Sequence, residues 1–484
     1  MRSAHGVDKV RAAEQALMAR LPEGALMQRA AAGLSRCCAA VLGSPYGRRV
    51  VLLVGSGDNG GDALYAGARL ARRGAGVRAL RAGSRIHPGG LAALRAAGGS
   101  VVDDPSVIDD ADLVVDGLVG IGGSGGLREP AATLAARTAV AGAAVVAVDV
   151  PSGVDASTGE VAGTAVRADV TVTFGTWKPG LLVDPGAGLA GAVQLVDIGL
   201  GADLPAPDVE APQAADVAAL LPVPGRETDK YRRGVVGVAA GSERYPGAAL
   251  LAVGAAVRSG AGMVRYSGPT RVADLVRARW PEVIVQEGMP DDTGRVQAWV
   301  IGPGLDTDET AKERLAQVLR SDVPVLVDAD GLSVLPEFVA EDGLRRSAPT
   351  VLTPHAGELA RLAGADRTDV ESRRLAHASD LAARLRATVL LKGSTTVVSE
   401  GEGPARVNPT GSGWLATAGS GDVLSGFLGG LLAQGLAPLD AASVGAYLHG
   451  VAARLAANGA PISASDLPAK LPEAWRSLRE SGGE

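Results

Sequence analysis

The chain has 484 residues, of which 46% are hydrophobic and 3% aromatic, with 67 glycines and a formal net charge of −6. This length predicts two to four domains rather than a single core, and the composition argues against a disordered chain. The sequence holds neither a basic block nor an uncharged apolar run of about 18 residues, which argues against nucleic acid and membrane as partners.

The first predicted elements are two helices, at residues 10–18 and 26–42, separated by a Leu-Pro-Glu-Gly turn. The only two cysteines, Cys37 and Cys38, are adjacent in the second of these helices. They offer neither a useful disulfide nor the ligand spacing of a zinc site. We therefore expect a reducing, cytoplasmic environment.

A strand, a glycine-rich turn and a helix follow. Residues 50–54 form a short continuous apolar run, typical of buried parallel strands, and a helix is predicted over 64–73. The Gly-Ser-Gly-Asp-Asn-Gly-Gly-Asp turn between them predicts a phosphate-binding βα unit. A dehydrogenase would also place an acid at the end of the next strand, where Arg78 and Arg81 stand instead. Carboxylate and amide oxygens within the turn suit a hard cation or a polar substrate.

Acidic residues end two of the next three strands, which are predicted at 112–115, 144–148 and 170–174. Asp116 precedes a second glycine-dense loop that ends at Arg128, and Asp149 precedes a Val-Pro-Ser-Gly-Val-Asp turn. Either acid alone could be a strand cap. Because ligands in open α/β sheets bind beyond the carboxyl ends of the strands, the polar turns together predict a ligand site there.

These motifs resemble the NAD(P)H-hydrate epimerase domain over residues 1–200. The resemblance is carried by D-N-G-G-D at 58–62, by the loop after Asp116, by V-D-V-P-S-G-V-D at 148–155 and by T-V-T-F-G-T-W-K-P-G at 171–180. It implies a Rossmann-like fold that interconverts the R and S epimers of hydrated NADH and NADPH.

The same resemblance implies the site residues. A potassium ion would be held by Asn59, Asp116 and Ser152, and Asp149 would be catalytic as well as a substrate contact. Asp58 and Ala63 depart from the more common Asn-Asn-Gly-Gly-Asp-Gly, and we expect both variants to be tolerated. The implied contacts of the hydrate are Asp58, Asn59, Gly60, Gly61, Asp62, Gly120, Ile121, Gly122, Gly123, Ser124, Gly125, Gly126 and Asp149.

Residues 201–212 are rich in proline, alanine and acids and lack periodicity, so we place a domain boundary there, between domains 1–212 and 213–484. Beyond it, strands alternate with helices, which predicts a second doubly wound α/β sheet with three layers. Polar clusters follow three of the strands. The predicted strands are 234–241, 262–266, 298–301, 324–327, 350–352 and 389–391, and the polar clusters are 328–331, 353–358 and 392–396.

The stretch from Asn408 to Gly426 carries the strongest chemical signal. Its glycines precede Asp422 and an apolar helix, and such a helix N-terminus offers backbone N–H groups to a phosphate. Asp422 would stand beside that phosphate, placed to take a proton from an attacking hydroxyl. The alternative is that Asp422 merely caps the helix. His355 could likewise be a cap, and Lys392 is either a phosphate contact or a surface lysine.

The second half resembles the ADP/ATP-dependent NAD(P)H-hydrate dehydratase domain, a relative of the ribokinase-like kinases. Y-P-G-A-A at 245–249, G-A-G-M-V-R at 260–265, G-P-G at 302–304, T-P-H-A-G-E at 353–358 and A-G-S-G-D at 418–422 carry the resemblance. It implies magnesium with ADP or ATP. The implied hydrate contacts are Ala248, Gly304, His355 and Asp422, and the implied nucleotide contacts are Lys392, Gly393, Ser394, Thr395, Thr396 and Gly421.

The two resemblances imply a bifunctional isomerase and lyase that repairs hydrated NADH and NADPH and assembles as a homo-oligomer. The S hydrate would be dehydrated at the expense of ADP or ATP, giving AMP and phosphate when ADP is used. Two alternatives stay open: the second half could phosphorylate a small alcohol, and the first could be a nucleotide-binding sensor. The residues leave open the preferred nucleotide, the preferred hydrate, the second acid or base of the epimerase and the oligomeric state.

Overall fold

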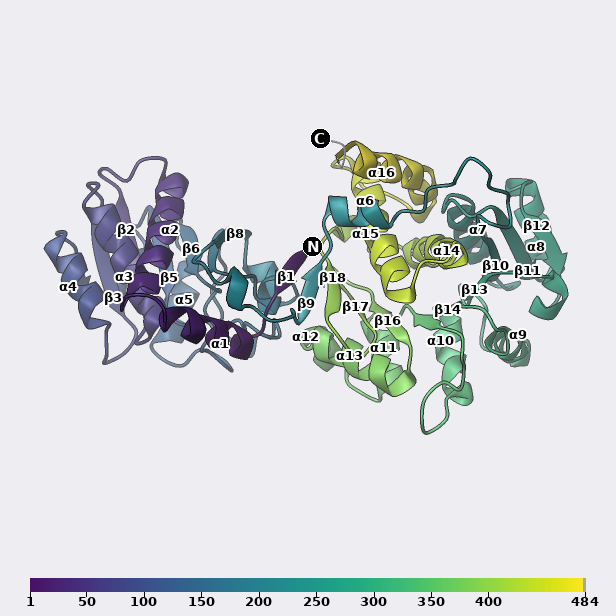
Figure 1. Cartoon of the computed structure of the whole chain (residues 1–484), viewed down its shortest axis with the longest axis horizontal. Helices are drawn as coiled ribbons and strands as arrows, with labels where there is room; N and C mark the ends of the chain where they lie inside the picture. Colours follow the sequence, from purple (N-terminus) through teal and green to yellow (C-terminus); the bar gives the residue numbers. More distant parts are fainter. Residues whose placement is uncertain (482–484) are drawn as a thin grey trace. The chain divides into compact units, whose positions relative to one another are not determined.

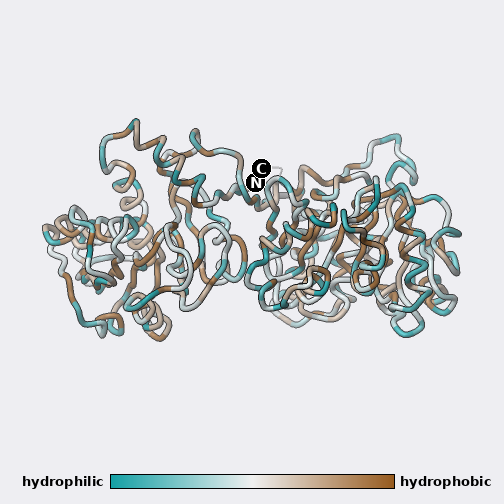
Figure 2. Tube along the Cα trace, turned by 90° about the horizontal axis from the view of Figure 1, so that it is seen from below, coloured by the Kyte–Doolittle hydropathy of each residue, from teal (hydrophilic) through white to brown (hydrophobic). Residues whose placement is uncertain are grey.

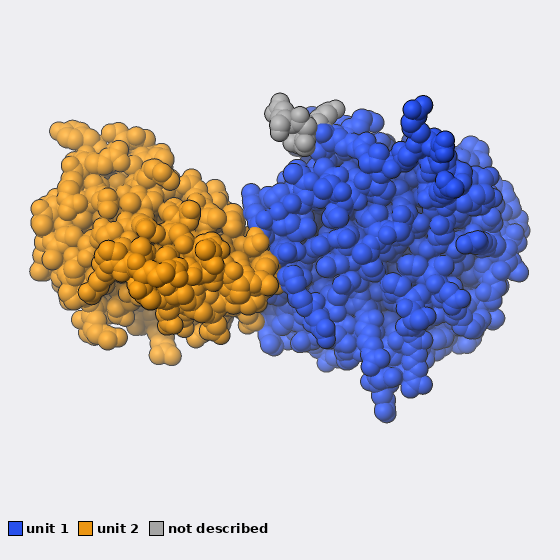
Figure 3. Space-filling view, in the orientation of Figure 1, with its two compact units in different colours: residues 1–2, 210–484 blue, residues 3–209 orange. Residues whose placement is uncertain are grey.

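The computed structural model describes residues 1–481, which form two compact units (Figure 3). Residues 3–209 make the smaller unit, and residues 1–2 and 210 onward make the larger one. The segment 201–212 contains a short 3₁₀ turn, Gly201–Asp203, and a strand, β9 (Val209–Ala211). Figure 2 shows hydrophobic segments running through the interior of each unit. No helix of the described part is long and apolar enough to cross a membrane.

The described residues of the smaller unit contain a parallel sheet of seven strands in the order β4-β3-β2-β5-β6-β7-β8 (Figure 1). Because β2 lies between β3 and β5, the strand order reverses at β2 and β5, and the carboxyl ends of these two strands open a crevice for ligands. The strands are β2 (Arg49–Val54), β3 (Gly76–Arg81), β4 (Ser100–Val102), β5 (Leu113–Gly117), β6 (Ala144–Val148), β7 (Val170–Phe174) and β8 (Ala192–Val196).

Helices cover both faces of this sheet. One buried core joins strand residues such as Leu52 to helices α2 and α3, and a second core joins residues such as Val114 to α5. The unit therefore has three layers, which confirms the predicted α/β class. The helices are α1 (Val7–Met18), α2 (Ala25–Leu42), α3 (Asp58–Ala71), α4 (Pro88–Ala96) and α5 (Ala131–Thr138).

The predicted start of the helix after β2 is wrong. It begins at Asp58 rather than at residue 64, so Asp-Asn-Gly-Gly-Asp forms its first turns. Glycines are poor helix formers, and for this reason the sequence predicts a loop over these residues. Here they allow close packing instead: a Cβ on Gly55 would collide with the carbonyl of Leu118, and one on Gly60 with the carbonyl of Gly55.

The larger sheet has eleven described strands in the order β1-β9-β18-β17-β16-β15-β14-β13-β10-β11-β12. The strands from β10 to β16 run parallel, whereas β16, β17 and β18 pair antiparallel. The strand order reverses at β10 and β13. Besides β9, the strands are β1 (Arg2–Ala4), β10 (Val235–Ala239), β11 (Met263–Gly268), β12 (Ile284–Glu287), β13 (Ala298–Ile301), β14 (Val325–Val327), β15 (Thr350–Leu352), β16 (Thr388–Leu391), β17 (Thr396–Ser399) and β18 (Ala405–Asn408).

A large apolar core packs helices α7, α14, α15 and α16 against one face of this sheet. Phe427 and Leu428 of α14 are fully buried in it, which fixes the helix behind its glycine-rich N-terminus. The helices are α6 (Ala214–Leu220), α7 (Pro246–Val257), α8 (Thr270–Arg279), α9 (Glu309–Leu319), α10 (Asp330–Val334), α11 (Ala356–Ala363), α12 (Arg367–Ser372), α13 (Arg374–Leu385), α14 (Ser420–Ala433), α15 (Pro438–Ala457) and α16 (Leu467–Ser481).

Candidate active sites

The turns after β2, β5 and β6 meet at the crevice of the smaller unit. Asp116, at the end of β5, is fully buried and accepts hydrogen bonds from the Ser152 N–H at 2.8 Å and the Ser152 hydroxyl at 2.6 Å. Burial raises the pKa of Asp116 to about 6, although these hydrogen bonds and one from the N–H of Leu118 lower it. The predicted ligands Asp116 and Ser152 therefore do lie together.

Asn59 reaches the same place from the first turn of α3. A Cβ on Gly120 would lie 2.7 Å from its side-chain oxygen, so the carboxamide packs against the loop after β5. Its Nδ2 is buried and meets no hydrogen-bond partner among the described residues. Carboxylate, hydroxyl and amide oxygens together are a donor set that fits a monovalent cation. Within residues 1–481, no three acidic, cysteine or histidine side chains gather in a way that could hold a metal ion, so any such cation depends on these mixed ligands.

Asp149 follows β6 with a left-handed backbone, φ 65°, and is held by a buried lysine. Lys178, only 1% exposed, donates to Asp149 Oδ1 at 2.5 Å, to the Thr173 hydroxyl at 3.0 Å and to the carbonyl of Phe174 at 2.9 Å. Sequence reasoning missed Lys178, although the Trp-Lys-Pro-Gly motif contains it.

Asp62, predicted as a substrate contact, is 9% exposed, and its Oδ1 is buried without a hydrogen-bond partner among the described residues. Burial, with the negative charges of Asp149, Asp58 and Glu14 in reach, raises the pKa of Asp62 well above its usual range. The pKa of Glu14, on α1, is also raised by burial. The crevice therefore holds carboxyl groups that favour the protonated form.

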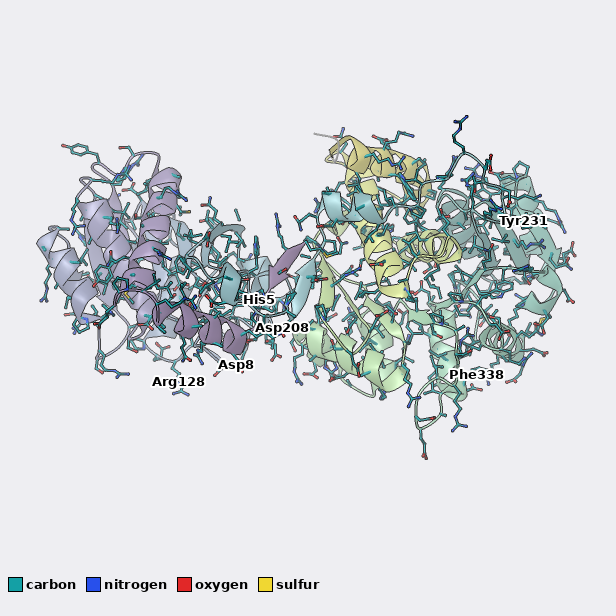
Figure 4. The ribbon with its side chains drawn as sticks, in the orientation of Figure 1. His5, Asp8, Arg128, Asp208, Tyr231 and Phe338 are labelled. Carbon is teal, nitrogen blue, oxygen red and sulfur yellow. The ribbon has the colours of Figure 1, made fainter. Side chains whose placement is uncertain are left out.

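A cavity of about 340 Å³ opens beside these turns. It is lined by Gly55 and Ser56, by residues 122–126 of the predicted hydrate loop and by Arg128, which follows that loop. Figure 4 labels Arg128 on the smaller unit. Gly120 and Ile121, also predicted contacts, are not among the residues that line the cavity. Arginine and a glycine-rich loop suit the diphosphate of a nucleotide.

In the larger unit, the parallel strands place their polar clusters at one edge, and helix α14 begins there. Gly419 precedes the helix with φ 88°, and no side chain caps its N-terminus. Asp422 lies in the first turn without serving as a capping acceptor. A Cβ on Gly421 would lie 3.3 Å from Lys392 Nζ, so the start of α14 faces the lysine that follows β16.

Lys392 belongs to a buried network. Its Nζ donates to Asp328 Oδ1 at 2.8 Å, and the hydroxyl of Ser425 donates to Asp328 Oδ2 at 2.6 Å. Glu358 Oε2 lies 3.8 Å from the same Nζ. Burial lowers the pKa of Lys392, but Asp328 and Glu358 outweigh it and the net shift is upward, so the ammonium stays charged. Sequence reasoning gave no role to Asp328 or Ser425; the Asp-Ala-Asp-Gly after β14 was the available signal.

The carboxyl of Asp422 is partly buried at the same strand edge. Burial raises its pKa to about 7, with a further rise from Asp328 and an opposing effect of Lys392. A general base works best when its pKa lies near the operating pH. The same strand edge brings Gly304 against Ala248, since a Cβ on Gly304 would lie 2.7 Å from the Cβ of Ala248.

His355 caps helix α11. Its Nδ1 accepts from the N–H of Glu358 at 3.1 Å, while Glu358 Oε2 accepts from the N–H of His355 at 2.7 Å, a reciprocal capping box. The cap that we kept as an alternative is therefore present. Burial lowers the pKa of His355, so the imidazole favours its neutral form.

The predicted nucleotide contacts at 392–396 form the turn between β16 and β17. Gly393 and Ser394 are exposed, whereas the side chains of Thr395 and Thr396 are buried. The Arg374 guanidinium donates to the carbonyl of Lys392 at 2.8 Å and so fixes the turn from α13. The exposed part of this turn is the part open to a ligand.

Comparison with known proteins gives two family matches. Residues 23–180 match the family described as YjeF-related protein N-terminus, and residues 236–474 match the family described as NAD(P)H-hydrate dehydratase. The chain is 50% identical to the bifunctional NAD(P)H-hydrate repair enzyme Nnr of Mycobacterium leprae, over 99% of this chain and 100% of that one. It is 51% identical to the Mycobacterium tuberculosis enzyme of the same name, over 92% of both chains.

Two solved structures resemble the larger unit. The ADP/ATP-dependent NAD(P)H-hydrate dehydratase of Bacillus subtilis, co-crystallised with ATP and Mg²⁺, is 32% identical with a TM-score of 0.51 and covers 55% of this chain and 97% of its own. A ribokinase-like protein of Enterococcus faecalis, 24% identical, has a TM-score of 0.51 over 56% of this chain and 96% of its own. The second likeness confirms the ribokinase-like fold.

Proposed function

Because the chain belongs to the family of bifunctional NAD(P)H-hydrate repair enzymes, we propose how its two units divide one repair between them. The smaller unit is the epimerase, and the larger unit is the ADP/ATP-dependent NAD(P)H-hydrate dehydratase. In the proposed division, the epimerase interconverts the R and S hydrates and the dehydratase consumes the S hydrate.

In the dehydratase, Asp422 takes the proton of the ring hydroxyl while the hydroxyl oxygen attacks the terminal phosphate of ADP or ATP. The new O–P bond forms as the bond to the nucleotide breaks, and Lys392 with the backbone N–H groups of residues 418–421 stabilises the transferred charge. Phosphate then leaves the ring carbon as the neighbouring carbon loses a proton, which restores the double bond. His355, Gly304 and Ala248 would contact the hydrate, and residues 392–396 and Gly421 the nucleotide.

Magnesium would neutralise phosphate charge when bound with the nucleotide, and the Bacillus subtilis relative was co-crystallised with ATP and Mg²⁺. Mg²⁺ usually binds through substrate phosphates and one or two carboxylates rather than a protein cage. This mode of binding is compatible with a site where, among the described residues, no three histidine, cysteine or acidic side chains gather to hold a metal ion.

The observation that carries the proposal is the placement of Asp422 at the N-terminus of α14, opposite the buried pair of Lys392 and Asp328. It is tested by incubating the full chain with the purified S hydrate of NADH and ADP. One NADH, one AMP and one phosphate are expected for each hydrate consumed. NADH formed without AMP would contradict the phosphorylation step.

The pH dependence of dehydration follows from the same base. Asp422 must be ionised to take a proton, so kcat/KM is expected to fall about tenfold per pH unit below about 7 and to level off above it. The charged groups around Asp422 are Asp328, Asp330, Glu358 and Lys392. Initial rates between pH 5 and 9 check this, and a rate that stays constant down to pH 5 would exclude Asp422 as the base.

In the epimerase, the hydrate would contact residues 58–62 and 120–126 and Asp149. We propose that Asn59, Asp116 and Ser152 bind potassium, which would offset the charge of the carboxylates around the substrate phosphates. The oxygen-rich donor set supports this assignment, because the carboxylate of Asp116 and the hydroxyl of Ser152 lie together and the side-chain oxygen of Asn59 packs against the neighbouring loop. The homo-oligomer also stays a proposal, which sedimentation or light scattering would test.

Asp116→Ala is expected to slow epimerisation and to abolish its dependence on potassium, while ADP-dependent dehydration of the S hydrate is unchanged. Melting temperature will fall as well, because Asp116 accepts three hydrogen bonds. The control is Asp112→Ala, a partly exposed acid that precedes the same strand. If Asp116→Ala loses stability but keeps its potassium response, Asp116 is only a structural acceptor.

A further inference from the structure

The ammonium of Lys178 donates all three of its N–H groups to acceptors within the protein. The three acceptors around its Nζ are Asp149 Oδ1, the Thr173 hydroxyl and the carbonyl of Phe174, all within 3.0 Å. An ammonium has three N–H donors, so none is left for a substrate. Lys178 thus orients Asp149 and does not itself exchange protons with the hydrate.

The two oxygens of Asp149 are not equivalent. Oδ1 accepts from Lys178, from the Thr173 hydroxyl at 3.0 Å and from the N–H of Phe174 at 3.1 Å. Oδ2 receives no hydrogen bond from any residue that the structure describes. One oxygen of Asp149 is therefore fixed, and the other is open to a proton from the substrate.

Asp62 is a second carboxyl group in the crevice, and its surroundings differ from those of Asp149. It comes from the first turns of α3, the helix that follows β2, whereas Asp149 follows β6. The buried Oδ1 of Asp62 meets no partner within residues 1–481. A buried carboxyl with an unpaired oxygen is costly unless it is neutral or meets a ligand. The carboxylate of Asp149 lies within electrostatic reach of it.

We propose that Asp62 is the second acid–base residue of the epimerase, working with Asp149, and that Lys178 is the positioning residue that orients Asp149. This inference rests on the proposed epimerase function. A site can supply an acid and a base together from two carboxyl groups in different surroundings. Here Asp62 has a buried oxygen without a partner among the described residues, whereas Asp149 is paired with the ammonium of Lys178.

The hydroxyl of the hydrate sits on a ring carbon bonded to the ring nitrogen. Asp62 gives its proton to this hydroxyl, the C–O bond breaks with its electron pair on the departing water, and the nitrogen lone pair forms a C=N bond. Water then adds to the other face of the carbon, the C=N electron pair returns to nitrogen, and Asp149 Oδ2 takes the released proton. The reverse reaction exchanges the two roles, and solvent returns the proton between turnovers.

Asp62→Asn keeps the shape of the side chain but cannot donate an acidic proton. With the purified S hydrate and no nucleotide, the appearance of the R hydrate is expected to slow about a hundredfold, the usual scale for loss of a general acid. Dehydration of the S hydrate with ADP should be unchanged, which shows that the larger unit is intact, and an unchanged melting curve shows that the smaller unit is folded. Glu14→Gln, the neighbouring carboxyl to which we assign no substrate contact, should stay within a few fold of wild type.

The pH profile of the intact chain tests the same point without a variant. The wild-type rate is expected to fall on the alkaline side as Asp62 loses its proton, and Asp62→Asn should lack this limb. The groups facing Asp62 are Glu14 from α1, Asp58 from its own helix and Asp149 after β6, and His87 packs against the adjacent Gly61. In H₂¹⁸O the epimerised hydrate should carry the label.

For Lys178, the Lys178→Met variant is expected to lower kcat with little change in KM, and Lys178→Arg should restore part of the loss. A wild-type chain that does not interconvert the hydrates would overturn the proposed function. A working wild type whose Asp62→Asn variant keeps its rate, whose alkaline limb is missing, or whose product carries no ¹⁸O would overturn this inference alone. The same holds if Glu14→Gln, rather than Asp62→Asn, loses activity.

Discussion

Asp422→Asn is expected to lower the rate of ADP-dependent dehydration by at least about a hundredfold, because it keeps the shape of the side chain and removes the base. The effect should fall on kcat, and ADP should still bind, since Lys392 and the start of α14 are untouched. The measurement is the initial rate of NADH formation from the S hydrate, with ADP affinity taken from titration calorimetry.

The control for this variant is Asp308→Asn. Asp308 caps α9 and accepts from the N–H of Ala311 at 2.8 Å, whereas no side chain caps α14. Asp308→Asn should therefore cost some stability and no activity. A near wild-type rate for Asp422→Asn would show that the proton leaves by another route.

Lys392→Met is expected to have the second largest effect, on two properties at once. ADP affinity should fall steeply, because a desolvated ammonium beside the phosphates is lost. The free energy of unfolding should fall by about 3 kcal/mol, the usual cost of leaving one partner of a buried ion pair alone. Asp328, the partner left behind, is 1% exposed and keeps only the bond from Ser425.

A double variant separates these two effects. Asp328→Asn with Lys392→Met removes both charges, so stability should recover in part while ADP affinity does not. Lys312→Met, which removes a partly exposed lysine paired with Glu309 and Glu337, should change neither property. Full ADP affinity in Lys392→Met would contradict the assignment of Lys392 to the phosphates.

Much of the architecture could be predicted from the sequence, because parallel strands, glycine-rich turns and acids have a regular order in α/β folds. The turns of Asp116 and Ser152 meet as expected, since their strands are neighbours in one sheet. The start of α3 could not be predicted from propensity, because close packing of Gly55 and Gly60 decides it.

The hydrogen-bonded pairs of side chains that hold the acidic residues of the two sites were harder to predict. Ser425 and Asp328 are 97 residues apart, and Lys178 and Asp149 are 29 residues apart. A hydrogen bond between residues this far apart leaves no local pattern in the sequence, and the sequence does not distinguish a buried lysine from a surface lysine. The motifs located the loops, but the protonation states depend on burial and on partners that only the folded chain supplies.

The most direct test of the proposed repair is to incubate the full chain with the mixed R and S hydrates of NADH, with and without ADP and Mg²⁺, and to follow NADH absorbance. Without ADP, no NADH should form. With ADP, both hydrates should be converted completely, because the epimerase refills the S hydrate that the dehydratase consumes. Conversion that stops when the S hydrate is exhausted, or a stable phosphorylated product without NADH, would contradict the repair reaction proposed for this chain.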